Sequence, residues 1–349
     1  MGEVKDVRDG THDSPKYISS GYPLVTSKNL TENGLDYSDI SYISEDDFLD
    51  INQRSKVEIG DIIFGMIGTI GNPVMVTSEG FAIKNVALLK NNGIIKNSFL
   101  IHLLKSPIFT KYVNLENAGG TQKFLGLTQI RNFECLIPNE EEQVILGEFF
   151  NDVDHLITLH QRKYDALKAM KKTLLSKMFP KDGEDIPEIR FKGFTDAWEQ
   201  RKLGNAINVR SGKDYKHLDE GDVPVYGTGG YMLSVSEALE NTQDAIGIGR
   251  KGTIDKPFIL KAPFWTVDTL FYCIPKENNS LDFLYPLFQS INWKLYDEST
   301  GVPSLSKTAI DGVTINLTSI DEQYSIGEYF ESVDNLITLH QRRSSRIIK

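Results

Sequence analysis

The chain contains the same seven-residue segment twice. Leu-Ile-Thr-Leu-His-Gln-Arg occupies residues 156–162 and recurs at residues 336–342, an offset of 180 in a chain of 349 residues. Residues 141–163 and 321–343 share 14 of 23 positions without a gap. This spacing is far longer than the roughly 20–45 residues of a stacked solenoid repeat. The duplication therefore predicts two similar domains, each followed by the same kind of helix.

The repeat continues into the globular parts. Residues 2–10 align with residues 204–212 at an offset of 202, through Gly, Val, Arg and Gly positions. Gly-Thr-Ile occurs at residues 68–70 and again at residues 252–254, an offset of 184. Because the offset falls along the chain, the first copy carries the longer insertions. We expect the helical segments to be alike and the preceding domains to have diverged.

Composition limits the classes of protein that the chain can belong to. A net charge of −10 argues against a uniformly basic nucleic-acid coat, although residues 162–177 form a local basic run. We find no apolar run of membrane-spanning length and no signal peptide, so we expect a cytoplasmic protein without a membrane partner. Two cysteines outside any ligand motif and six scattered histidines predict no metal and no cofactor.

Hydrophobic patterning predicts five segments. They are a mixed α and β domain at 1–140, a helix at 141–180, a linker and lead-in at 181–204, a second domain at 205–318 and a short second helix at 319–349. Shorter helices are expected at residues 97–113 and 282–296, and a Gly-rich loop at 118–123 corresponds to 299–304. The predicted fold class is α/β (α+β), with two similar globular domains joined by two long antiparallel helices in pseudo-twofold symmetry.

The first long helix begins at an acidic entry and carries one broad apolar face. From Glu141 to Met178 it would extend roughly 57 Å, at about 1.5 Å per residue. Two copies of one helix in a single chain pack most economically in antiparallel fashion. The residues expected to pack between the helices are Phe149, Val153, Leu156, His160, Leu167, Leu174, Phe330, Val333, Leu336 and His340.

Three motifs resemble the specificity subunits of type I restriction–modification systems, over nearly the whole chain. They are Arg-Asp-Gly-Thr-His-Asp-Ser-Pro-Lys-Tyr at 8–17, Ile-Pro-Glu-Ile-Arg-Phe-Lys-Gly-Phe-Thr-Asp-Ala-Trp-Glu-Gln-Arg-Lys-Leu-Gly at 186–204, and both copies of Asp-x-Leu-Ile-Thr-Leu-His-Gln-Arg. The resemblance implies two target-recognition domains that each read half of a bipartite site in double-stranded DNA. It also implies helices that set the spacing and dock methyltransferase subunits, restriction (translocase and nuclease) subunits joined through the complex, and no catalysis by this chain.

The chain departs from this pattern at both ends. The first domain begins near the counterpart of Gly204, so residues 187–203 have no equivalent before it. Lys349 aligns with Ala169, so residues 170–180 have no equivalent after it. The resemblance therefore does not extend to helix pairing and partner docking at that end.

Side chains that read DNA are donors and acceptors on loops, with Lys, Arg and hydroxyl groups on phosphates. The candidates in the first domain are Arg8, Thr11, His12, Lys16, Tyr17, Lys28, Thr69, Lys84, Gln122 and Lys123. Those in the second domain are Arg210, Lys213, Tyr215, Lys216, Tyr226, Thr228, Arg250, Lys251, Thr253, Lys256, Ser304 and Lys307.

Structural roles remain open for several of these candidates. Arg8 and Arg210 are equivalent, which suits a structural or phosphate role as well as base reading. The two threonines of the Gly-Thr-Ile segments can simply shape turns, and Tyr215 and Tyr226 can belong to the core.

Two other functions are possible. Residues 247–252 match the Gly-x-Gly-x-x-Gly pattern of a dinucleotide site, which requires a following helix. The sequence after this match predicts a turn into a strand instead, so a nucleotide-binding enzyme is the least favoured interpretation. An assembly scaffold whose domains do not bind DNA is the other alternative.

Overall fold

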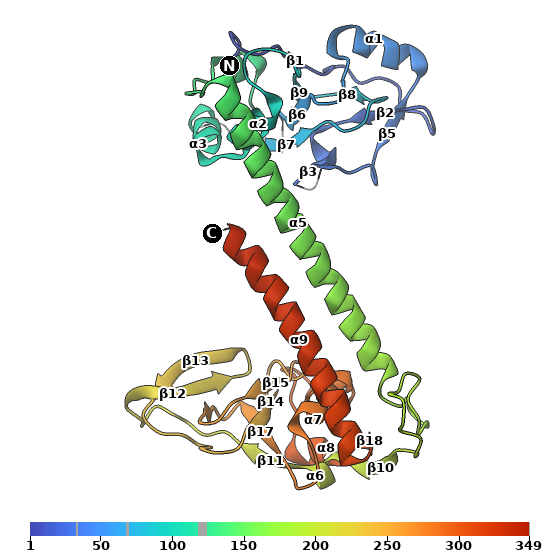
Figure 1. Ribbon diagram of the computed structural model, residues 1–349, viewed down its shortest axis with the longest axis vertical. Coiled ribbons are helices and arrows are strands. Elements are labelled where there is room, and N and C mark those ends of the chain that lie inside the picture. Colours follow the sequence, from blue (N-terminus) through green and yellow to red (C-terminus); the bar gives the residue numbers. More distant parts are fainter. Residues whose placement is uncertain (33, 68–69, 118–123, 349) are drawn as a thin grey trace. The chain divides into compact units, whose positions relative to one another are not determined.

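The protein is described by a computed structural model over residues 1–348, apart from residues 33, 68–69 and 118–123, with side chains through Arg343 (Figure 1). The chain divides into two compact units, Met1–Leu156 (unit 1) and Ile157–Lys349 (unit 2). The long helix α5, Glu140–Lys177, contributes its first part to unit 1 and the remainder to unit 2. Among the described residues, we find no helix long and apolar enough to cross a membrane.

Unit 1 is built on an antiparallel sheet with the strand order β1-β9-β6-β7. Its strands are β1 (Val7–Asp9), β9 (Val86–Leu89), β6 (Ile62–Gly65) and β7 (Gly71–Met75). Both faces of the sheet are covered. Ile62 and Phe64 belong to one hydrophobic cluster, and Ile63 between them belongs to another. Alternation along the strand therefore sends neighbouring side chains into two cores.

Helices and a second sheet cover these two faces. The helices are α1 (Glu45–Ser55), α2 (Asn97–Lys105), α3 (Pro107–Glu116) and α4 (Leu127–Asn132), with a 3-10 turn at Ser27–Asn29. The second sheet has the order β5-β2-β8, with β5 at Ser41–Ile43, β2 at Tyr22–Val25 and β8 at Ala82–Ile83. A separate hairpin is formed by β3 (Leu30–Thr31) and β4 (Gly34–Leu35). Leu100 of α2 and Ile130 of α4 are fully buried in the cluster that contains Phe64.

Unit 2 repeats the central sheet in the order β11-β17-β14-β15. Its strands are β11 (Ile207–Ser211), β17 (Leu270–Pro275), β14 (Ala245–Gly249) and β15 (Phe258–Leu260). The strand register repeats as well. Val7 pairs with Leu89 in unit 1, and Val209 pairs with Cys273 in unit 2. These pairs are related by the offsets 202 and 184 that the sequence alignment gives, so the two sheets are counterparts residue by residue.

The remaining elements of unit 2 surround this sheet. They are β10 (Glu199–Lys202), α6 (Leu203–Ala206), β12 (Glu220–Gly227), β13 (Gly230–Val235), β16 (Trp265–Thr266), α7 (Leu281–Ser290), a 3-10 turn at Trp293–Tyr296, α8 (Lys307–Gly312), β18 (Thr314–Leu317) and α9 (Ile320–Ile348). Strands β13, β12 and β16 form a second sheet, and β10 pairs with β18. The core cluster joins α7, α9 and the central sheet through residues such as Phe283, Phe330 and Ile246.

Helices α5 and α9 run antiparallel where they meet in unit 2. His160 of α5 lies against His340 of α9, and Lys171 lies against Asp334. Phe179, just after α5, stacks on Phe330, with ring centroids 6.1 Å apart. Because the α9 partner number falls as the α5 number rises, the two directions are opposite, as predicted.

The residues predicted to pack between the helices divide into two groups. Phe330, Val333 and His340 are buried, and Val153, His160, Leu167 and Leu174 are half-buried. The prediction is wrong for Leu336, which is 46% exposed within unit 2. Phe149 and Leu156 belong to unit 1 and are 59% and 46% exposed, and their packing against α9 stays a prediction.

The spacing of the buried residues explains this error. In α9 the buried residues are 330, 333 and 340, with half-buried Ile337 between them, a 3-4-3 spacing along one face of the helix. Phe330 on this face also packs in the core with α7. Leu336 stands one position outside this face, and Leu156 is its counterpart. The predicted apolar face is therefore one residue too wide.

Proline also changes a helix boundary. The helix predicted over residues 97–113 is divided into α2 and α3 at Ser106, whose backbone is extended (φ −74°, ψ 159°). Pro107 cannot donate to the preceding turn and disfavours a helical conformation at the residue before it. The helix predicted over residues 282–296 is also divided, without a proline at the break: α7 ends at Ser290 and residues 293–296 form a separate 3-10 turn.

Candidate nucleic-acid interface

In unit 2, four of the predicted DNA-binding residues line one groove of about 580 Å³. Arg250 and Lys251 follow β14, while Ser304 lies just before α8 and Lys307 is the first residue of α8. The two segments are more than fifty positions apart in sequence, and the fold brings them together. The groove is therefore a polar surface with three cationic side chains.

Backbone hydrogen bonds hold these two segments against each other. The Leu305 amide donates to the Arg250 carbonyl at 2.9 Å, and the Gly252 amide donates to the Pro303 carbonyl at 2.8 Å. On the other side, the Arg250 amide donates to the Thr269 carbonyl at 2.8 Å. Because these hydrogen bonds fix the backbone on both sides, the cationic side chains project into the groove from backbone atoms at defined positions.

Glycines permit the tight turn that makes this arrangement possible. A Cβ atom on Gly249 would lie 2.0 Å from the Thr253 carbonyl oxygen, closer than any side chain tolerates. Gly252 has φ +95°, in the region that favours glycine. The glycines of this segment thus serve the turn after β14.

This turn also contradicts the interpretation of residues 247–252 as a nucleotide-binding motif. A dinucleotide fingerprint needs a helix whose N-terminus meets the pyrophosphate. Residues 250–257 contain no helix, and β15 follows them. The match to the pattern is therefore coincidental.

The groove contains residues that the sequence patterns did not indicate. Ser211 at the end of β11, Asp268, Thr269 and Glu298 also line it. Ser211 directly precedes the aligned Gly212, so the repeat places this segment beside the candidates without singling out the serine. Asp268 and Glu298 carry no local signal. They make the groove mixed in charge, and they can accept hydrogen bonds from base amino groups.

The other candidates in unit 2 lie outside the groove. Arg210 donates to the buried carboxylate of Glu240 at 2.9 Å, which supports a structural role for its guanidinium. Tyr215 and Tyr226 are half-buried against hydrophobic clusters, which supports the core interpretation. The rest are exposed or half-buried on separate segments: Lys213, Lys216, Thr228, Thr253 and Lys256.

In unit 1, the opening segment forms its own polar network. Asp6 accepts from the Arg8 guanidinium at 2.7 Å. His12 lies between Asp9 and Asn85, with nitrogen-to-oxygen distances of 2.8 and 2.9 Å, and these hydrogen bonds raise the pKa of His12. The polar groups of Arg8 and His12 are therefore already engaged within the domain.

Lys84 does not fit the role predicted for it. Its side chain is only 9% exposed, and its ammonium donates to the Ser14 hydroxyl at 2.7 Å. The residue follows β8 and forms a bridge with Thr11, which draws the lysine inward. Lys84 is thus a structural lysine that joins the opening segment to the second sheet.

The remaining candidates of unit 1 are not gathered into one site. Lys16 and Tyr17 are exposed, and Lys28 is exposed and paired with Asp39 at 2.9 Å. Three predicted residues lie outside the described part of the chain: Thr69, Gln122 and Lys123.

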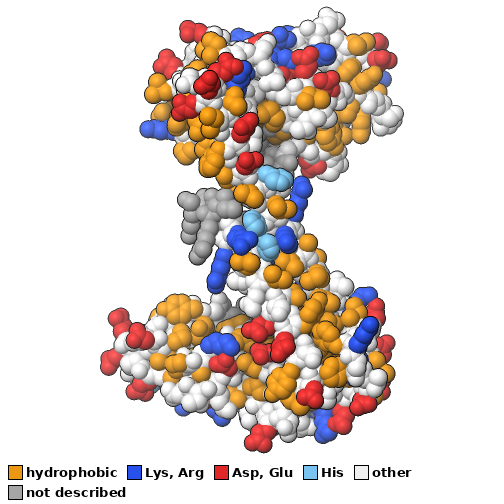
Figure 2. Space-filling view, in the orientation of Figure 1, with side chains coloured by type: hydrophobic (Ala, Val, Ile, Leu, Met, Phe, Trp, Pro, Cys, Tyr) orange, Lys and Arg blue, Asp and Glu red, His pale blue; other side chains and the backbone are white. Residues whose placement is uncertain are grey.

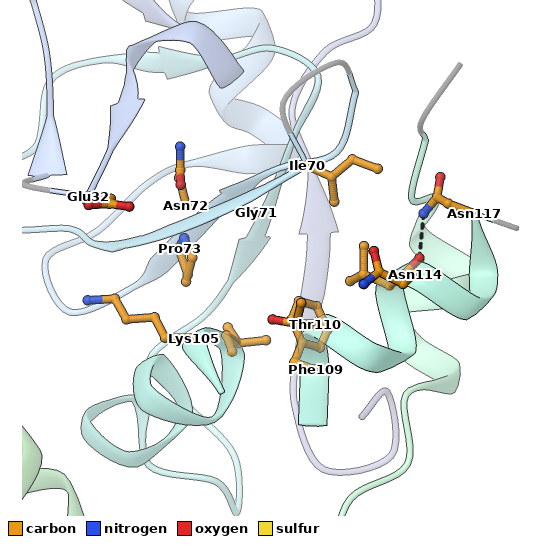
Figure 3. A pocket seen from close by; sticks show the side chains of 12 residues that line it. Glu32, Ile70, Gly71, Asn72, Pro73, Lys105, Phe109, Thr110, Asn114 and Asn117 are labelled. Atoms are coloured by element: carbon orange, nitrogen blue, oxygen red, sulfur yellow. Dashed lines mark hydrogen bonds between the residues drawn. The ribbon is translucent and has the colours of Figure 1, made fainter. Parts of the chain in front are cut away.

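A hollow of about 640 Å³ lies between β7 and α3 in unit 1 (Figure 3). Its polar lining includes Asn72 from β7, Lys105 from α2 and Asn114 from α3, none of which was predicted. Asn117 at its margin corresponds to Glu298 of the unit 2 groove at an offset of 181, the offset that relates the two Gly-rich loops. The hollow and the unit 2 groove therefore share one corresponding position in the two copies.

The surface as a whole is not that of a basic protein. On the face shown in Figure 2, Lys, Arg, Asp and Glu side chains are scattered over the globular parts, and Lys and Arg gather beside the pale-blue histidines in the middle of the view. Together with the net charge of −10, this makes the three cationic side chains of the unit 2 groove a local feature. Any contact with a polyanion must use such local groups.

Comparison with known proteins agrees with the two-unit architecture. Residues 2–169 and 195–349 each match the family described as the type I restriction modification DNA specificity domain. The chain is 21% identical over 379 residues to the type I restriction enzyme MjaVIII specificity subunit of Methanocaldococcus jannaschii, covering 96% of this chain and 87% of that protein.

Two solved structures share the fold. The S subunit of a type I restriction–modification system from M. genitalium superposes with a TM-score of 0.64 at 15% identity, covering 99% of this chain and 91% of that one. A structure describing complex assembly and conformational transition of the type I R-M system gives a TM-score of 0.55 at 16% identity, covering 99% and 93%.

These matches cover most of both copies of the repeat. The fold and the paired domains define a duplicated DNA-specificity protein. The chain belongs to the family of type I restriction–modification DNA specificity subunits.

Proposed function

We propose that each unit of this chain reads one half of a bipartite site in double-stranded DNA, while α5 and α9 set the spacing and dock methyltransferase subunits. Restriction subunits join through that complex, and this chain performs no chemistry itself. We place the complex in the cytoplasm. Family membership and the duplicated central sheet support this proposal.

The observation that carries the proposal is the groove of unit 2. Arg250, Lys251 and Lys307 converge there from two segments, beside the hydroxyl of Ser304, on an otherwise acidic chain. Arginine forks pair with guanine edges, and lysines contact phosphates as point charges. We assign base contact to Arg250 and phosphate contact to Lys251 and Lys307.

Fluorescence anisotropy with duplex DNA tests this assignment, using the full chain together with its methyltransferase subunits. Lys251→Ala and Lys307→Ala should each weaken binding to all sequences alike and reduce the salt slope by about 0.9 for each phosphate that is no longer neutralised. Arg250→Ala should cost about 1–3 kcal/mol on the cognate half-site and little elsewhere. Lys261→Ala removes a charge paired with Asp244 away from the groove and serves as the matched control.

The assembly-scaffold alternative makes the opposite prediction. A scaffold would assemble with methyltransferase subunits and show no salt-sensitive DNA binding in that complex. If Lys261→Ala and Lys307→Ala changed the DNA affinity equally, the groove would not be part of the DNA-binding interface.

A further inference from the structure

The hairpin of β12 and β13 in unit 2 carries a stretch without charge (Figure 1). Residues 223–236 contain no Asp, Glu, Lys, Arg or His, in a chain of which 25% is Asp, Glu, Lys or Arg. Two apolar side chains of this stretch are nevertheless largely exposed, Tyr231 at 63% and Met232 at 50%. Neighbouring exposed apolar side chains on a folded domain commonly mark a binding surface. Such a surface recognises its ligand by apolar contact rather than by charge.

The turn of this hairpin borders the groove of unit 2. The Val267 amide donates to the Tyr226 carbonyl at 3.0 Å, and Asp268, the next residue, lines the groove. A Cβ atom built on Gly252 would lie 3.8 Å from the Thr228 hydroxyl oxygen. Gly252 directly follows the two cationic residues after β14, and Thr228 lies in the turn between β12 and β13. The turn and the groove are therefore neighbours on the surface of unit 2.

The exposed methionine lies in a β-bulge. Tyr231 of β13 pairs with Tyr226 of β12. The next pair along the hairpin joins Leu233 to Val225. One strand advances by two residues while the other advances by one, so Met232 is the extra residue of the bulge. Bulges re-aim a side chain and are common beside functional sites.

A glycine of β12 makes room for this methionine. A Cβ atom built on Gly227 would lie 2.8 Å from Sδ of Met232 and 3.7 Å from Cγ2 of Val267. Met232 therefore lies over the bare backbone of Gly227, on the side of β12 where Val267 packs. The neighbouring Tyr231 is engaged along the hairpin, with its ring edge to face on Tyr226 at 6.3 Å. Of the two exposed side chains, Met232 thus lies toward the segment that leads into the groove.

A hairpin of this kind fits the major groove of B-DNA, which admits a two-stranded β-ribbon. Most groups on the base edges there are hydrogen-bond donors or acceptors, and the apolar one is the C5 methyl group of thymine. A thioether side chain is flexible and polarizable, so it adapts to such a group. The charges that flank the stretch are the carboxylates of Asp222 and Glu237, which phosphates repel. The turn end of the hairpin is therefore the end that suits DNA.

We propose that Met232 determines specificity by contacting the methyl group of a thymine in the half-site that unit 2 reads. This contact rests on the proposed function and adds a named base to it. Arg250, in the neighbouring groove, pairs with a guanine edge of the same half-site. The half-site of unit 2 therefore contains at least one A·T pair whose methyl group contributes to affinity.

Uracil in place of thymine tests this contact, because it removes the methyl group and leaves base pairing unchanged. The probe is a fluorescent duplex with the bipartite motif found by methylome sequencing, in which each thymine is replaced singly by deoxyuridine. Anisotropy is measured with the full chain and its methyltransferase subunits. At one position of one half-site, the parent chain should bind the uracil duplex about three- to fivefold more weakly, the value of one buried methyl group. Met232→Ala should bind both duplexes equally.

Two further variants separate this contact from a general disturbance of the hairpin. Tyr231→Ala removes the neighbouring exposed side chain and should keep the full preference for thymine. Met232→Leu, of similar volume, should keep most of the preference. Met232 is half exposed, so circular dichroism of its variants should match that of the parent chain.

Three results would overturn the role of Met232. One is equal binding of the thymine and uracil duplexes by the parent chain at every position. Another is a preference for thymine that persists in Met232→Ala, and the third is a preference that Tyr231→Ala also abolishes. These results leave the proposed function intact, whereas the absence of sequence-specific binding by the parent chain would contradict that function itself.

Discussion

His160 and His340 occupy the same position in the two copies of the repeat, and their Nδ1 atoms lie 3.0 Å apart. When two equivalent segments pair in antiparallel fashion, a residue that meets its own counterpart marks the centre of the pair. One ring must donate and the other must accept, so at least one imidazole of the pair is neutral. The central contact of the helix pair is therefore made by two titratable side chains.

Acid should weaken this helix pair. Burial, followed by Lys163 and the neighbouring histidine, lowers the pKa of His340. The pKa is lower in the folded state than the unfolded value of about 6.5, so the stabilisation is present above that value and is lost as the pH falls below it. Urea denaturation at a series of pH values should show the loss. His340→Leu should reduce the pH dependence and exposed His155→Gln should not; identical profiles for both variants would contradict the assignment.

The ion pair between α5 and α9 should contribute to the stability of unit 2. The Lys171 ammonium, 12% exposed, donates to both carboxylate oxygens of Asp334, at 2.6 and 2.8 Å. Asp334→Asn should lower the free energy of unfolding by about 1–2 kcal/mol, because it leaves a half-buried ammonium without its charged partner. Asp152→Asn on the exposed side of α5 is the control. Equal unfolding midpoints would show that the pair is neutral for stability.

Equivalent glutamates of the two repeats should differ in their effect on stability. The buried Glu322 carboxylate accepts from the Arg190 guanidinium at 2.7 and 2.8 Å. Glu322→Gln removes one partner of this ion pair and should cost about 3–5 kcal/mol. Glu142→Gln at the exposed counterpart should change the free energy of unfolding by less than about 0.5 kcal/mol. Thermal and chemical unfolding of both variants measure the difference. Similar losses would mean that the two glutamates contribute alike.

The turn after β14 should tolerate no side chain at Gly249. A Cβ there would lie 2.0 Å from the Thr253 carbonyl oxygen, so Gly249→Ala should cost about 1–3 kcal/mol and disturb the groove. Gly301→Ala adds the same atom where nothing lies within 4 Å and should be nearly neutral. Calorimetry of the two variants compares them. A stable Gly249→Ala chain with unchanged DNA affinity would contradict this description of the turn.

The repeat makes a large part of the fold predictable. Its offsets relate Val7–Leu89 to Val209–Cys273, so the strand register of one unit, once known, carries over to the other. The antiparallel helix pair follows from the same duplication. The predicted seam is too broad, because an apolar face of 3.6 periodicity does not show which edge faces the partner, and Leu336 falls outside it.

The candidate site is less predictable, because it depends on residues distant in sequence. Arg250 is a strong candidate from its Gly-rich surroundings, but its approach to Lys307 depends on bonds between the turn after β14 and the segment before α8. Lys84 resembles a surface lysine in the sequence, and only the bridge to Thr11 explains its burial. Composition and spacing do not encode such long-range placements.

Methylome sequencing tests the central claim most directly. It should be applied to a host that carries this chain with its methyltransferase subunits, and to the same host with the Arg250→Ala/Lys251→Ala/Lys307→Ala chain. The account predicts one bipartite methylated motif for the parent chain, and for the variant loss of methylation or relaxation confined to one half-site. A methylated motif that is unchanged in the variant would contradict the role of the groove, and one that is unchanged when the chain is deleted would contradict the function itself.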